Sequence, residues 1–178
     1  MSYRAAILNL SARSEAAVVA LYARLSARAV TEEEFVAYAT AALIRADEQA
    51  VSLADLGLAA FLTVATRRAV PTLGLTLPAD KPAQLDKAVR TLVAVLPDTP
   101  HPEARVARIG RAEPLTTGTR AYGDGMRTRP EVTGYRRSLS GNACELCSWW
   151  AGGGRVFPDD RPMPTHKGCS CTQVPVLH

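Results

Sequence analysis

The chain has 178 residues, of which 47% are hydrophobic and 21% charged. This length gives room for one ordinary domain, or one domain and a small module, and excludes two large domains. The composition excludes a disordered chain and a collagen-like repeat. No apolar run of about 18 residues is free of charges, and the N-terminal apolar stretch is too short for a signal peptide. We therefore expect neither membrane insertion nor secretion.

The excess of positive charge lies in the C-terminal part of the chain. Residues 1–100 hold ten Lys or Arg and ten Asp or Glu, whereas residues 101–178 hold eleven and seven. A stretch from residue 120 to 137 is rich in arginine and has only Asp124 and Glu131 as acids. This arginine-rich stretch favours a polyanion such as nucleic acid, or an acidic protein surface, as partner. A solvated loop accounts for the same composition at least as well. Its arginines are Arg120, Arg127, Arg129, Arg136 and Arg137.

Apolar residues recur with helical spacing in four places within the first hundred residues. Each set forms one apolar face, as expected for helices that pack on one another. The four sets fall at residues 18–25, 35–42, 53–64 and 85–92. We predict about four helices over residues 1–96, packed as a bundle.

Two sequence signals mark helix starts in this region. Thr31 and Glu34 have the spacing of a capping box, so a helix should begin near residue 32. Ser52 and Asp55 repeat this pattern more weakly and indicate either a kink or a new helix.

Prolines and glycines mark the connections. Asp80 precedes a proline in a first helical turn, which predicts a connector over residues 71–78. Three prolines between residues 97 and 102 end the preceding helix and mark a boundary after residue 96. A short helix over residues 103–110 is then followed by an expected long loop over residues 111–130. Within this loop, residues 122–126 are expected to form a tight turn.

All four cysteines lie in one C-terminal pattern, C-x2-C-x18-H-x2-C-x-C. Thiolates and imidazoles are the ligands that Zn²⁺ prefers, and two short chelating pairs about 15 to 20 residues apart are typical of structural zinc sites. A tetrahedral zinc site has four ligands, and the pattern offers five candidate residues. The sequence favours His166 with one of the last two cysteines, because Gly168 lets the chain turn sharply between them. The candidates are Cys144, Cys147, His166, Cys169 and Cys171.

Besides metal binding, three further roles of the cysteines stay open, as does a metal bound in the cell and followed by oxidation outside it. Disulfides that join Cys144 or Cys147 to Cys169 or Cys171 would suit a particle that leaves the cell. A thioredoxin-like pair would need a helix start within a βαβ unit, and no alternation of strands and helices surrounds this C-x-x-C. The thiols could also be buried without any link between them.

Apolar residues around the cysteines complete a small module. Trp149 and Trp150 directly follow the second cysteine, and we interpret them as the core of a module too small to fold on apolar burial alone. Val156 with Phe157, and residues 174–176, are expected to form short strands. Pro175 indicates that the second of these lies at a sheet edge.

This C-terminal region resembles that of the MuF-like minor capsid, or head morphogenesis, proteins of tailed bacteriophages, in particular the short type of actinobacteriophages. The resemblance covers about 45 residues, and the helical part is similar only in general character. The matching stretches are Gly134-Tyr-Arg-Arg137, Gly141-Asn-Ala-Cys-Glu-Leu-Cys147, His166-Lys-Gly-Cys-Ser-Cys-Thr172 and Val174-Pro-Val176.

The resemblance implies a structural protein of the phage head interior, present in the host cytoplasm during assembly. It further implies association with the portal or major capsid protein, action in head assembly, and a role in packaging or ejection of DNA. No small-molecule substrate and no enzymatic activity follow from it. An alternative function is that of a zinc-containing nucleic-acid-binding protein that uses the arginines of residues 120–137.

The expected fold class is thus mainly α, with a helical bundle followed by a small irregular α+β module of zinc-knuckle type. The expected parts are a helical domain (1–96), a Pro/Gly-rich linker and loop (97–131) and the Cys/His module (132–178).

Overall fold

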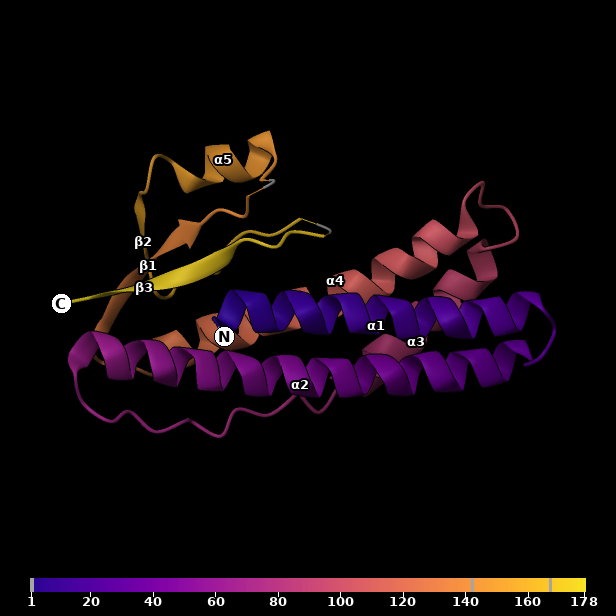
Figure 1. Ribbon diagram of the computed structural model, residues 1–178, viewed down its shortest axis with the longest axis horizontal. Coiled ribbons are helices and arrows are strands. Elements are labelled where there is room, and N and C mark those ends of the chain that lie inside the picture. The colour runs from indigo at the N-terminus through magenta and orange to yellow at the C-terminus, as the bar shows by residue number, and fades with distance from the viewer. Residues whose placement is uncertain (1, 142, 167) are drawn as a thin grey trace.

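The computed structural model describes residues 2–141, 143–166 and 168–178. It is mainly helical, with a small antiparallel sheet near the C-terminus (Figure 1), as the sequence predicts. Asn142 and Lys167, which belong to the stretches that carry the family resemblance, lie outside the described residues.

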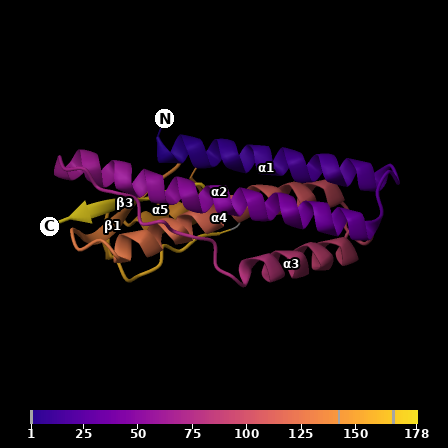
Figure 2. The same ribbon diagram turned by 90° about the horizontal axis from the view of Figure 1, so that it is seen from below.

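Long helices make up the body of the molecule. The helices α1 and α2 lie side by side and antiparallel, α4 packs on both, and α3 packs on α2 (Figures 1 and 2). The stripes at residues 35–42 and 53–64 belong to one continuous helix, so the described part of residues 1–96 holds three helices instead of four. The bounds are α1 Tyr3–Ser26, α2 Glu32–Thr66, α3 Lys81–Val95 and α4 Pro102–Arg127.

The predicted capping box is present at the start of α2. The Thr31 hydroxyl accepts from the Glu34 N–H at 3.2 Å, and the Glu34 carboxylate accepts from the Thr31 N–H at 2.7 Å. Asp55, by contrast, marks neither a kink nor a helix start. Its buried carboxylate accepts three backbone N–H groups of the connector, at distances of 2.7 to 3.1 Å, and so holds residues 73–75 against α2.

The loop predicted over residues 111–130, with its tight turn at 122–126, is wrong, because α4 runs through it. The glycines there serve close helix packing. A Cβ at Gly110 would lie 2.8 Å from the Cα of Glu15 in α1, and one at Gly118 would lie 3.0 Å from Ile7. Pro114 is buried within the helix. Tertiary packing therefore overrides the poor helix propensity of this segment.

The C-terminal sheet has three antiparallel strands in the order β2-β1-β3. The two predicted strands are confirmed as β2 (Val156–Pro158) and β3 (Thr172–Leu177), and β3 lies at an edge as Pro175 indicates. The central strand β1 (Val132–Ser138) and the short helix α5 (Glu145–Ala151) have no counterpart among the expected elements.

The sheet and the helices share one apolar core. Leu58 of α2 and Met126 of α4 belong to the same cluster as Tyr135 and Phe157 of the sheet. Arg4 of α1 adds polar links, because its guanidinium donates to the carbonyl oxygens of residues 138 and 139 and to the Thr172 hydroxyl. The helical body thus holds the base of the sheet in a fixed position.

Trp149 does not form the core of the module, contrary to the sequence-based interpretation. Its side chain is 76% exposed, whereas Trp150 is half-buried. The module has its own buried cluster, which consists of the thiols of Cys147, Cys169 and Cys171. The thiols, and not the Trp149 side chain, therefore form the buried centre of the module.

The helix α2 is long and apolar enough to cross a membrane by length and composition alone. Core helices meet the same criteria, so this is weak evidence. The helix contacts α1, α3 and α4, and it carries buried carboxylates at Asp47 and Asp55.

Asp47 lies within the helical core, and its side chain is fully buried. Its carboxylate accepts from the Thr117 hydroxyl at 2.9 Å and lies 3.4 Å from the Lys81 ammonium. Burial raises the pKa of Asp47 from 3.8 to about 6, although Lys81 and Thr117 act in the opposite direction. The folded protein therefore favours the protonated carboxyl.

We predict that Asp47→Asn gains stability relative to the wild type as pH rises. Below the unfolded pKa the carboxyl is protonated in both states, whereas near neutral pH the folded state must hold it charged. The raised pKa corresponds to a relative gain of about 2 kcal/mol between about pH 4.5 and about pH 7. Urea unfolding of both proteins across this range measures it, and a constant difference would contradict the prediction.

Candidate metal centre

The first two cysteines are positioned by α5. Cys144 occupies the N-cap position of this helix and Cys147 lies in its first turn, with the first thiol exposed and the second buried. The C-x-x-C therefore does stand at a helix start. The neighbouring strands are antiparallel, however, so the described residues around it form no βαβ unit of thioredoxin type.

The remaining candidates come from the segment that leads into β3. Gly168 has a φ of +77°, and the Cys169 N–H donates to the His166 carbonyl at 3.0 Å. This tight turn brings the imidazole and the next thiol to the same side of the chain, as the position of the glycine predicts. Cys171 directly precedes β3 and is held beside β1 by the strand pairing.

The distances between the ligand atoms are close to those of a metal site. The Nε2 atom of His166 lies 3.3 Å from the Cys144 sulfur and 3.1 Å from the Cys147 sulfur, and the sulfurs of Cys147 and Cys169 are 3.6 Å apart. In a zinc tetrahedron, two sulfurs are about 3.8 Å apart and a sulfur lies about 3.5 Å from a ring nitrogen. Small side-chain shifts would bring these atoms around one ion.

The five candidates form two overlapping groups that share one residue. The ligand atoms of Cys144, Cys147 and His166 lie within 4.8 Å of one another, and so do those of Cys147, Cys169 and Cys171. Cys147 belongs to both groups and is therefore the residue that links them. All four cysteines are free thiols, and the 3.6 Å between Cys147 and Cys169 is far longer than a disulfide bond of about 2.05 Å.

Arg137 of β1 lies directly against these thiols and is only 5% exposed. Its Nη2 atom donates to the sulfurs of Cys147 and Cys169, both at 3.3 Å, and its Nη1 atom donates to the Pro164 carbonyl at 2.7 Å. The guanidinium carbon also lies 5.2 Å from the centre of the Trp150 ring. A cation thus forms one wall of the thiol cluster.

The thiols differ in their acidity. Burial raises the pKa of Cys147 to about 12, although the hydrogen bond from Arg137 acts against this. Backbone N–H groups of α5, that of Cys147 first, lower the pKa of Cys144. Burial acts to raise the pKa of Cys171, but hydrogen bonds, first that of the Ser140 backbone, outweigh it and lower the pKa. Coordination to a cation would deprotonate every ligating thiol.

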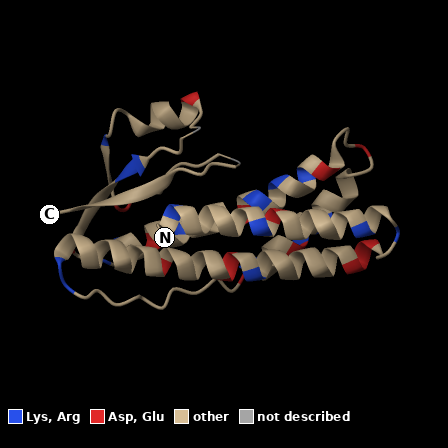
Figure 3. Cartoon of the chain, in the orientation of Figure 1, with Lys and Arg blue, Asp and Glu red and all other residues tan. Residues whose placement is uncertain are grey.

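The five arginines of residues 120–137 occupy separate environments. Arg137 faces the thiols, and Arg129 donates to the carbonyl of Pro71. Arg127 pairs with Asp124 at 2.5 Å, whereas Arg120 and Arg136 are exposed. Basic residues are distributed over several helices and the sheet instead of gathering on one element (Figure 3).

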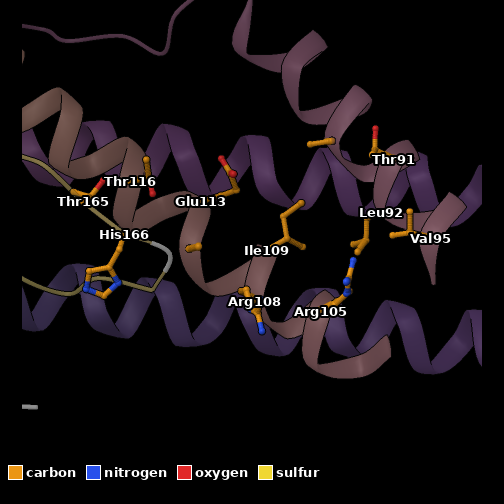
Figure 4. A pocket seen from close by; sticks show the side chains of 12 residues that line it. Thr91, Leu92, Val95, Arg105, Arg108, Ile109, Glu113, Thr116, Thr165 and His166 are labelled. Atoms are coloured by element: carbon orange, nitrogen blue, oxygen red, sulfur yellow. The ribbon is translucent and has the colours of Figure 1, made fainter. Parts of the chain in front are cut away.

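Two clefts between the helices and the module are lined by arginines, of which some belong to this stretch and others do not. The first, of about 550 Å³, is lined by Arg105 and Arg108 of α4 and reaches His166. Figure 4 shows His166 at one end of this cleft and Val95 of α3 at the other. The second, of about 400 Å³, is lined by Arg120, Arg127 and Arg161 and shares two threonines with the first.

Sequence reasoning missed Arg105 and Arg108 as candidates. Their spacing of three residues places them on one face of a helix, but only a short helix is expected there from the sequence, within a segment assigned to the linker. Val106 and Ile109 beside them have helical spacing, but both fall within the short helix that the sequence predicts, so they give no signal for a longer one.

Comparison of this chain with protein families, with curated proteins and with solved structures found no match. The resemblance to the MuF-like proteins therefore rests on the motifs of residues 134–176 alone.

Proposed function

We propose that this protein is a structural, non-enzymatic component of a tailed-phage head, with a C-terminal module that a zinc ion holds together. The observation that carries the proposal is the convergence of three thiols and an imidazole at 3.1 to 3.6 Å in a segment that resembles MuF-like minor capsid proteins. Zinc with four protein ligands has no open position for water and so serves structure, not catalysis.

The size of the module supports a metal. The helix α5 has seven residues and β2 has three, and the cluster of buried residues around the cysteines contains only thiols. Units of this size rarely bury enough apolar surface to fold, and a structural metal is a common substitute.

Exposed apolar side chains support an interaction with other proteins. On α2, Leu56 is 57% exposed and Val64 is 80% exposed, and on α5 Trp149 is 76% exposed. Leu56 and Val64 lie together, because both line one groove beside α1 and β3. Exposed apolar side chains that lie together mark protein interfaces, whereas single ones are ordinary. In the proposed role the partner is the portal or the major capsid protein, and the protein resides in the interior of the head.

We predict that the protein purified without chelator holds about one zinc per chain, measured by elemental analysis. Cys147→Ser should lose the zinc, because Cys147 belongs to both groups of candidates. The variant should also lose the module's protection from proteolysis, since metal binding and folding are coupled.

Ser170→Ala is the matched control, because Ser170 lies between two candidate ligands and offers no thiol. A wild-type protein that holds no metal, and whose module melts on addition of a reductant, would contradict the metal and favour disulfides.

The head-assembly role predicts incorporation into particles. On co-expression with the portal and major capsid proteins of a tailed phage of the type that it resembles, the chain should co-sediment with assembled heads at low copy number. The Cys147→Ser variant should enter heads less efficiently than the wild type. Absence of the wild-type chain from heads, together with no binding to the isolated portal, would refute this role.

One observation favours nucleic-acid binding as a second function. Arg105, Arg108 and Arg120 line the two adjoining clefts, and within the described part of the chain no carboxylate pairs with them. Such arginines are available for phosphate groups. Arg129 and Arg137, in contrast, are engaged with the protein itself.

If the clefts bind DNA, the affinity should fall steeply with salt, and the triple replacement of Arg105, Arg108 and Arg120 by Ala should flatten the log–log slope by about 0.9 for each lost phosphate contact. Arg13→Ala is the control, because the exposed Arg13 lines neither cleft. Fluorescence anisotropy with a duplex measures this, and no binding at low salt would remove the second function.

A further inference from the structure

The burial of Arg137 sets a condition on the charge of the thiol cluster. Its guanidinium is always charged and is almost completely buried. Among the residues that the structure describes, no carboxylate lies within 4.0 Å of it. A buried charge without a counter-charge is strongly destabilising, so a compensating negative charge is required nearby.

Among the described groups in contact with Arg137, the cysteines are the ones that can supply that negative charge. The other groups in contact with Arg137 are the Pro164 carbonyl and the Trp150 ring, both of which are neutral. Neutral thiols would leave the guanidinium uncompensated, and a disulfide would remove the acidic groups altogether. The position of Arg137 therefore fits thiolates, which a bound cation maintains.

Counting charges distinguishes the ligand sets. Zn²⁺ with four thiolates carries a net charge of −2, and with three thiolates and a neutral imidazole it carries −1. Two thiolates with the imidazole and a water give a neutral site. Only the set of three thiolates and one imidazole is neutralised by the single positive charge of Arg137.

We propose that Arg137 is the built-in counter-charge of a site with three thiolates and one imidazole, and that Cys144, Cys147, His166 and Cys169 are its ligands. This inference rests on the proposed metal. Cys171 then remains outside the coordination sphere as a thiol. Arg137 acts as a positioning residue, because it orients the sulfurs of Cys147 and Cys169 through its Nη2 atom.

The contacts of the two cysteines favour Cys169 over Cys171 as the fourth ligand. Cys169 accepts from Arg137 and lies 3.6 Å from Cys147, which is close to a tetrahedral edge. Cys171 also lies within 4.8 Å of the other two sulfurs, but the bonds from the Nη2 atom of Arg137 go to Cys147 and Cys169, and the Cys171 sulfur lies 3.9 Å from the Ser140 hydroxyl. N–H groups that donate to metal-bound sulfurs are typical of the residues around such sites.

The ligand set is tested with a matched pair of serine variants of the full-length protein. Cys171→Ser should retain one Co²⁺ or Zn²⁺ per chain at wild-type affinity, whereas Cys169→Ser should lose tight binding. The absorption of the cobalt form reports the set directly, because thiolate-to-cobalt charge transfer grows with the number of thiolates. The wild type and Cys171→Ser should both give the spectrum of three thiolates and one nitrogen.

The role of Arg137 is tested by Arg137→Gln, which should weaken metal binding by about 10–100-fold without a change in the number of thiolates in the cobalt spectrum. Arg137→Lys keeps the charge and should recover part of the affinity, which a purely space-filling role would not require. Arg136→Gln is the control, because the neighbouring side chain lies on the exposed face of β1.

The outcomes separate this inference from the proposed metal. A wild-type protein that binds neither metal refutes the metal itself. Metal binding with a spectrum of four or of two thiolates, or retention by Cys169→Ser with loss in Cys171→Ser, overturns the ligand set alone. Equal affinities of Arg137→Gln and the wild type overturn the role of the arginine. If Arg137→Gln does not fold, the cysteine pair still decides the ligand set.

Discussion

The C-terminal module depends on one interaction, the hydrogen bonding of the Arg137 guanidinium to the thiols of Cys147 and Cys169. The arginine belongs to the central strand of the sheet, while the thiols come from α5 and from the segment before β3, so this contact joins three parts of the module. Because a buried cation is tolerated only beside negative charge, the contact also constrains the chemical state of the sulfurs. The fold of this part of the chain and the chemical state of its cysteines are therefore linked.

The helical body supplies the rigid base on which that contact can form. The helix α4 approaches α1 closely at Gly110 and Gly118, and its end carries Met126 into the core that holds Tyr135 of β1. Tyr135 and Arg137 are two residues apart and point to the same face of the strand. The packing of the tyrosine against the helices thus fixes the direction in which the guanidinium points, and with it the place of the candidate ligands.

Much of this arrangement can be predicted from the sequence, and the failures have identifiable causes. The capping box at Thr31 and the clustering of the cysteines depend on near neighbours, so local patterns suffice for them. The helix α4 escapes prediction because its glycines and Pro114 have poor propensity, and their role in packing appears only with α1 in place. From the sequence alone, Arg137 cannot be told apart from the exposed arginines near it. Only the alternation of buried and exposed positions along β1 shows that its side chain is buried. The choice among the five candidate ligands depends on the contacts of Arg137 with the sulfurs, which the sequence does not show.

The hydrogen bonds of Arg4 link the second residue of α1 to the end of β1 and the start of β3. These partners are separated by 134 and 168 positions along the chain. Contacts between such distant positions form late, because the chain entropy lost in closing the loop is recovered only after the intervening elements are in place. During synthesis, α1 and α2 can pair long before residue 172 emerges from the ribosome. The first turn of the first helix is therefore among the last parts of the molecule to reach its final surroundings. The Arg4 hydrogen bonds form only when both ends of the chain are in place.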